Sequence, residues 1–161
     1  MILLGPGLIL AALPGPQADL PGPDRLVAIG GFLFRIARVA FDTTAMGFVP
    51  EDMGPKDRLM FVEFELLSGN RDDFMGLAIT LDSGRGRRSK AAALISGGMM
   101  KALSALTIKS ASSRYRPDST NIAWAFVVRE GDRDFFLTFP TGDVVSLGPG
   151  FSGPRPKRQG P

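Results

Sequence analysis

The sequence contains no histidine and no cysteine. Without histidine, Ser-His-Asp and Cys-His arrangements cannot form, and the side chain that ordinarily titrates near neutral pH is missing. Without either residue, zinc, copper, haem and iron–sulfur sites lose their normal ligands. A disulfide framework and a lipid-anchored cysteine are excluded as well. We therefore expect no catalytic residues, no cofactor and no metal.

Tyrosine and tryptophan are also scarce, with one of each against twelve phenylalanines. Phenylalanine has no polar atom, so we expect these rings mainly in the core. The chain has 161 residues, of which 44% are apolar and 22% charged. That composition is typical of a globular protein and leaves room for one domain.

The net charge of +3 is distributed unevenly along the chain. Four cations lie within residues 85–90, and three more lie within residues 155–158. The remaining body of the chain has a small negative charge. A basic loop and a basic tail, rather than a basic fold surface, argue against specific nucleic-acid binding.

The amino terminus has an apolar run over residues 2–13 that is too short to span a bilayer as a helix. It is typical of the central region of a secretory signal peptide, with cleavage near Ala18. This predicts an exported protein, periplasmic or extracellular. The alternative is a cytoplasmic or virion structural subunit whose apolar arm adds a strand to a neighbour.

Mass spectrometry of the mature amino terminus distinguishes these two possibilities. Loss of residues 1–18 is the expected result, because an export signal is removed after translocation. Retention of the segment would contradict export and favour the assembly arm.

Proline and glycine mark the limits of the folded part. Residues 19–24 have the composition of a linker, and residues 148–161 that of a disordered basic tail. Residues 154–158 of this tail could tether the protein weakly to an anionic surface, but a plain disordered end explains them better. The folded domain is therefore predicted to span residues 25–147.

The clearest structural signal is alternation of apolar and polar residues with a period of two. One apolar face is formed by Ile122, Trp124, Phe126 and Val128, and the pattern returns in residues 135–139 after a turn. Such alternation predicts a β-hairpin with one apolar face that a second sheet covers. We expect Trp124 to be central to that core.

Two other runs alternate as clearly. Residues 59–67 place four apolar side chains on one face and Glu63 and Glu65 on the other, which predicts that both glutamates face solvent. In residues 32–41 the apolar face switches, so we predict a bulge near Ala37. The remaining predicted strands are 26–29, 77–81, 104–109, 121–129, 134–139 and 143–147.

Residues 89–103 contain much alanine, leucine and methionine, interrupted by Gly97-Gly98, and predict a short helical or irregular crossover. The whole pattern predicts an all-β fold: an immunoglobulin-like antiparallel β-sandwich of about seven to eight strands. A small closed barrel is the alternative.

The order of features from residue 32 to 147 resembles that of a group of secreted bacterial immunoglobulin-like domains. The resemblance rests on strands at 34–41 and 59–70, an Asp-Ser-Gly turn at 82–84, and an Arg-Pro-Asp-Ser segment at 116–119 before the final strands. The group, largely of unknown function, includes a mycobacterial immunoprotective extracellular protein. The resemblance implies an exported accessory or recognition module without catalysis, and no site residue transfers with it.

The best candidate site is the loop 84–90, in which glycines alternate with cations. Guanidinium groups can bind phosphate, sulfate or carboxylate oxygens in pairs. The candidate anion-binding residues are Arg85, Arg87, Arg88 and Lys90. The partners that fit are anionic glycans, cell-envelope polymers, lipid head groups or another protein; the alternative is a solvated loop without a ligand.

Acidic side chains offer weaker candidates. Residues 70–73 and 132–134 could contribute calcium ligands, but turn-forming aspartates explain both clusters better. A hydrolase using only carboxylates is a further alternative, with Asp72, Asp73 or Glu63 as its candidates. It requires two carboxylates in one pocket.

Overall fold

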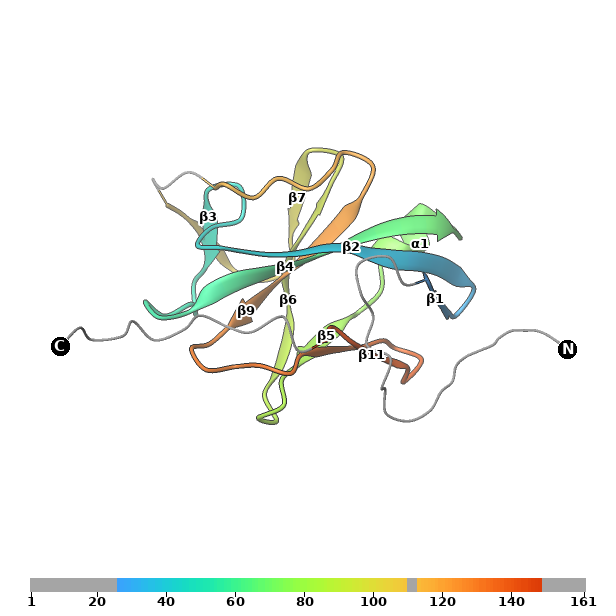
Figure 1. Ribbon diagram of the computed structural model, residues 1–161. Helices are drawn as coiled ribbons and strands as arrows, with labels where there is room; N and C mark the ends of the chain where they lie inside the picture. Colours follow the sequence, from blue (N-terminus) through green and yellow to red (C-terminus); the bar gives the residue numbers. More distant parts are fainter. Residues whose placement is uncertain (1–25, 110–112, 149–161) are drawn as a thin grey trace, which may run out of the picture.

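The protein's structure, a computed structural model, describes residues 26–109 and 113–148, which form eleven strands and one short helix (Figure 1). The predicted signal peptide, the linker and nearly all of the basic tail lie outside the described residues. The elements are β1 (Leu26–Ile29), β2 (Phe32–Asp42), β3 (Phe48–Pro50), β4 (Arg58–Ser68), α1 (Arg71–Met75), β5 (Thr80–Asp82), β6 (Arg88–Ser96), β7 (Met99–Ala102), β8 (Leu106–Ile108), β9 (Ile122–Val128), β10 (Phe136–Thr138) and β11 (Val144–Ser146).

Nine of the eleven strands form one curled antiparallel sheet in the order β1-β2-β4-β9-β6-β5-β10-β11, with β7 paired to β6. Strands β3 and β8 form a separate two-stranded sheet. Strand β6 belongs to both layers, because its first residues pair with β5 and its later residues pair with β9 and β7. In Figure 1 the layer that contains β5 and β11 lies below β2 and β4. The predicted all-β antiparallel sandwich is thus confirmed.

The main core lies between the two layers. Trp124 is fully buried and meets Phe64 and Phe74 edge to face, with ring centroids 5.1 and 5.4 Å apart. The predicted inward face of β9 is confirmed, since Ile122, Phe126 and Val128 lie in the same cluster. From the opposite layer the core receives Leu81, Phe135, Leu137, Phe139, Val145 and Leu147.

A second, smaller core covers the other face of β4 and β9. Leu59 and Phe61 are fully buried there, beside Ala123 and Ala125. Leu106 of β8 and Tyr115 pack against this face. Strand β4 is therefore buried on both sides, and the prediction that Glu63 faces solvent is wrong: only 2% of Glu63 is exposed.

Strands β9 and β10 do not form the predicted hairpin. Strand β9 lies between β4 and β6, whereas β10 lies between β5 and β11. The connection between them crosses from one layer to the other. Alternation determines which side chains point inward, but it does not determine which strand is the partner.

The segment 89–103 is a β-hairpin made by β6 and β7 rather than a helical or irregular crossover. Gly97 and Gly98 have φ angles of +59° and +76°, as a two-residue type I′ turn requires. The helix propensity of residues 89–103 is overridden by pairing within the sheet, where the alanines pack against neighbouring strands. Ala93, for example, is paired with Ala125. Together with β3, this hairpin accounts for the strands beyond the predicted seven to eight.

The predicted bulge near Ala37 is confirmed. Ile36 is paired with Phe64, whereas Arg38 is paired with Glu63, so Ala37 is the extra residue on β2. Ile36 points into the main core, and the bulge brings Arg38 to the opposite face. Arg38 can therefore meet Glu63 there.

Candidate functional site

Residues 83–87 form the turn between β5 and β6, whereas Arg88, Ser89 and Lys90 of the predicted loop 84–90 belong to strand β6. The backbone N–H of Ser83 donates to the carbonyl of Arg87 at 2.9 Å, and that of Gly86 donates to the carbonyl of Ser83 at 2.9 Å. Gly86 has a φ of +80°, which suits glycine at the last loop position of a three-residue hairpin. In Figure 1 this turn projects from the bottom of the molecule. We call residues 82–90 the arginine hairpin.

Arg87 is held by an aspartate distant in sequence. Its Nε donates to Oδ2 of Asp132 at 3.1 Å, and Asp132 is almost completely buried. The same carboxylate oxygen also accepts the backbone N–H of Arg129 at 2.9 Å. The hydrogen bond from Arg129 fixes the Asp132 carboxylate within the turn 129–132. This carboxylate in turn holds the guanidinium of Arg87 at its Nε atom. The two terminal amino groups of Arg87 have no hydrogen bond within the described residues.

Arg88, the first residue of β6, is held in the same manner by Asp82 of the neighbouring strand β5. Its Nε donates to Oδ1 of Asp82 at 2.7 Å, and the hydroxyl of Thr138 donates to Oδ2 of Asp82 at 2.7 Å. The hydrogen bond and the charge of Asp82 raise the pKa of Arg88 above its ordinary value. The Arg88 side chain remains 66% exposed. Its terminal amino groups are therefore accessible to a ligand.

Arg85 lies against the turn that contains Asp132. A Cβ atom added to Gly131 would lie 3.3 Å from a terminal nitrogen of Arg85, and Gly131 has a φ of +86°. The structure therefore brings Arg85 and Arg87 together beside the turn 129–132. Lys90 lies two residues after Arg88 on the same face of β6, so all four predicted cations belong to one end of the molecule.

A buried polar network lies on the second face of β4, the face that the alternation of residues predicts to be exposed to solvent. Glu63 accepts the hydroxyl of Tyr115 at 2.7 Å and the Arg38 guanidinium at 2.8 Å through Oε2. Its Oε1 accepts the backbone N–H of Asp118 at 3.0 Å and the side-chain amide of Asn121 at 2.7 Å. Glu63 thus fixes the segment 113–121 to β4.

Aromatic contacts complete this network. The ring of Tyr115 stacks on Phe61 with centroids 4.2 Å apart, and the guanidinium carbon of Arg38 lies 4.9 Å from the centroid of the Tyr115 ring. Sequence reasoning missed the roles of Arg38, Tyr115 and Asn121. The only local signal was the bulge near Ala37, which indicates that Arg38 lies on the face of Glu63.

The network sets the protonation states of its members. Burial alone raises the pKa of Glu63, but hydrogen bonds from Asn121, Tyr115, Asp118 and Arg38 outweigh burial and lower it. Burial and the bond to Glu63 raise the pKa of Tyr115 well above its usual range. Glu63 is therefore ionised and Tyr115 protonated at neutral pH. A glutamate that acts as a general acid needs a raised pKa instead.

The other carboxylates of the hydrolase hypothesis lie elsewhere. Asp72 and Asp73 occupy the first turn of α1, where the side chain of Asn70 accepts the backbone N–H of Asp73 as the helix cap. Phe74 of this helix lies in the main core, on the opposite face of the sheet from Glu63. The three candidate carboxylates are not brought into one pocket.

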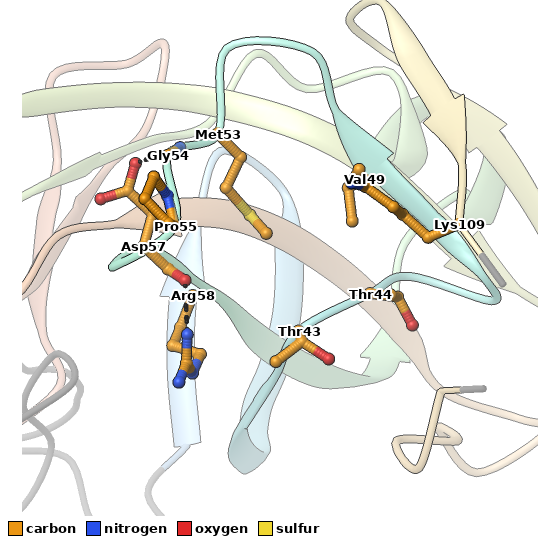
Figure 2. A pocket seen from close by; sticks show the side chains of 9 residues that line it. All are labelled: Thr43, Thr44, Val49, Met53, Gly54, Pro55, Asp57, Arg58 and Lys109. Carbon is orange, nitrogen blue, oxygen red and sulfur yellow. Dashed lines mark hydrogen bonds between the residues drawn. The ribbon is translucent and has the colours of Figure 1, made fainter. Parts of the chain in front are cut away.

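The structure also has an open groove of about 450 Å³ (Figure 2). Its polar groups serve the local backbone, because Asp57 accepts the N–H of Gly54 at 2.9 Å and Arg58 donates to the Asp57 carbonyl at 3.0 Å. The polar side chains do not converge on the groove, so it has little to orient a ligand. It is lined by Thr43, Thr44, Val49, Met53, Gly54, Pro55, Asp57, Arg58 and Lys109.

No model of a known protein family matches the chain, and no curated protein matches it. A solved structure similar in fold is an uncharacterized β-sandwich protein from Clostridium difficile 630. It is 10% identical, with a TM-score of 0.45, and the match covers 83% of this chain and 100% of that chain. The present chain is a β-sandwich by its own strand pairing. The resemblance to the mycobacterial group gains no support from these comparisons and stays a prediction.

Within residues 26–109 and 113–148, no helix has the length and apolar character needed to cross a membrane.

Proposed function

We propose that the protein is a non-catalytic binding module that recognises anionic polymers through the arginine hairpin. The observation that supports this function best is the attachment of Arg87 and Arg88 to buried aspartates through Nε alone. Each guanidinium is thereby anchored at its Nε edge, while the side chains of Arg87 and Arg88 remain 34% and 66% exposed. Less side-chain entropy is then lost when an anion binds.

The charges of the arginine hairpin favour an anion even after internal pairing. Asp82 and Asp132 offset two of its four cations, and Arg85 and Lys90 remain exposed. Phosphate, sulfate and carboxylate groups accept paired hydrogen bonds from guanidinium groups, which makes a polymer of such groups a suitable ligand. Binding that depends on these contacts weakens as salt concentration rises.

Replacement of Arg85, Arg87 and Arg88 by serine is expected to lower the salt concentration at which the protein elutes from immobilised heparin. Three guanidinium groups are removed from the binding surface, so most of the retention should be lost. The matched control replaces Lys101, Lys109 and Arg114, which are also exposed, and removes the same charge elsewhere. Equal elution of both triple variants would contradict the proposed site.

Folding is checked separately, because Arg87→Ser leaves the buried Asp132 without its charged partner. The double variant Arg85→Ser/Arg88→Ser leaves that pair intact and should still show a clear loss of retention. In this variant Asp82 loses Arg88 but keeps the hydrogen bond from Thr138. Thermal unfolding followed by circular dichroism establishes that each variant remains folded. A folded double variant that is retained like the unmodified protein would also contradict the proposal.

We also propose that this module acts outside the cytoplasm. The support is the apolar run over residues 2–13 followed by small residues, together with a fold that needs no reduced thiol. Analysis of the mature amino terminus tests export independently of the heparin experiment.

A further inference from the structure

The outer face of the small layer has a regular arrangement of side chains. Arg88 of β6 is paired with Asp82 of β5, which is paired with Phe136 of β10, which is paired with Ser146 of β11. A second row runs parallel to the first. It consists of Lys90, Thr80, Thr138 and Val144. We call these eight residues the outer face.

Hydrogen bonds show that these side chains share one face. Asp82 binds Arg88 on one side and Thr138 on the other. The alternate residues of the same strands point inward, since Leu81 and Leu137 lie in the main core. Side chains two residues apart on a strand lie on the same face, which places Thr80, Phe136 and Lys90 with them.

The chemistry of the outer face changes from one side to the other. Cations stand on β6, Asp82 and Thr80 stand on β5, Phe136 and Thr138 stand on β10, and Val144 and Ser146 stand on β11. Phe136 is partly exposed and lies outside both cores, and Val144 is 57% exposed. Phe136 thus departs from the expectation that the phenylalanines serve the core.

We propose that the outer face binds the sugar rings of an anionic polysaccharide whose charged groups contact the arginine hairpin. This inference rests on the proposed function and names its ligand class. Neighbouring strands are about 4.8 Å apart, so Phe136 lies about 10 Å from Arg88 across the sheet. A disaccharide unit can span that distance, with an acidic group on Arg88 and the C–H face of a ring on Phe136.

Two features favour a polysaccharide over a nucleic acid. The half-buried Thr80 lies on β5, between the cations of β6 and the aromatic ring on β10, where sugar hydroxyls need partners. Trp124 and Tyr115, the chain's single tryptophan and tyrosine, are buried and cannot stack on bases.

The test compares two anionic polymers, heparin, which has sugar rings, and inorganic polyphosphate, which has none. Phe136→Ala is expected to weaken heparin binding roughly three- to tenfold, the range of a lost aromatic contact, and to leave polyphosphate binding unchanged. The matched control is Phe41→Ala on β2, where the ring is 39% exposed. It should change neither affinity.

A second variant guards against loss of folding. Phe136→Leu keeps the strand and much of the apolar area but removes the ring. It should also weaken heparin binding and leave polyphosphate binding unchanged. Unchanged heparin binding in folded Phe136 variants would overturn the inference and leave the proposed function intact. Equal weakening for both polymers would overturn it too, since ring contact predicts a difference. If the triple arginine variant binds both polymers normally, the proposed function itself fails.

Discussion

Trp124→Ala is expected to lower the free energy of unfolding by about 3–5 kcal/mol. Trp124 has no exposed surface and meets Phe64 and Phe74 edge to face between the two layers. Removing the indole leaves a cavity between β9, β4 and α1 that the surrounding side chains fill only in part. Because globular domains are stable by about 5–15 kcal/mol, this change threatens folding altogether.

Urea unfolding followed by circular dichroism measures this effect. Trp124→Phe is the matched control. Its indole N–H has no hydrogen bond within the described residues, so phenylalanine loses volume but no polar contact. We expect the phenylalanine variant to lose less than half as much stability. An alanine variant with the urea midpoint of the unmodified protein would show that this face of β9 is not the core.

The inward faces of the strands could be predicted because they depend on a local property. Side chains alternate across a strand whatever its neighbours are, so the faces of Trp124 and of residues 135–139 follow from the sequence alone. The bulge near Ala37 could be predicted for the same reason, since a change of parity within one strand requires an extra residue.

Strand partners could not be predicted in this way. A turn at residues 130–131 lies between β9 and β10, yet β9 pairs with β4, whose residues lie about 60 positions earlier. The choice of partner depends on packing of the whole sheet. Residues 89–103 form a hairpin for a related reason: Gly97 and Gly98 allow a tight turn, and the helix propensity of the flanking residues does not reflect that geometry.

The candidate site was predictable only in part. The cations of the arginine hairpin are adjacent in sequence and could be found there. Their orientation depends on Asp132, which is 45 residues from Arg87, and on Thr138, which is 56 residues from Asp82. Exposed or buried aspartates in turns look alike in a sequence, so the attachment of the arginines could not be foreseen.

The prediction for Glu63 is wrong because alternation alone does not show that only one face of a strand is buried. A strand in the middle of a sheet can be covered on both faces, and β4 is covered by the main core on one and by Tyr115 and β8 on the other. Glu65, two residues later, does remain partly exposed beside Arg35. The two glutamates therefore differ in environment although their sequence pattern is the same.

Glu63→Gln is expected to lower the free energy of unfolding by about 2–4 kcal/mol. The amide has nearly the same shape, but its NH₂ group would face donors from Tyr115 and Arg38 or from Asn121 and the Asp118 backbone. At least one buried donor then lacks an acceptor. Glu65→Gln is the matched control, and loss of this partly exposed ion pair should cost less than about 1 kcal/mol.

The same variant also tests the ionisation of Glu63. Its pKa is lowered in the folded protein, so its contribution to stability is complete above the ordinary glutamate pKa of about 4.3 and disappears as pH falls through the lower folded value. Unfolding free energy measured between about pH 6 and pH 3 should therefore fall more steeply in the unmodified protein than in Glu63→Gln. Some slope remains in the variant, because hydrogen bonds also lower the pKa of Asp42 and Asp118. Identical slopes would show that Glu63 is not held as a carboxylate, and the anchoring of segment 113–121 would then need another explanation.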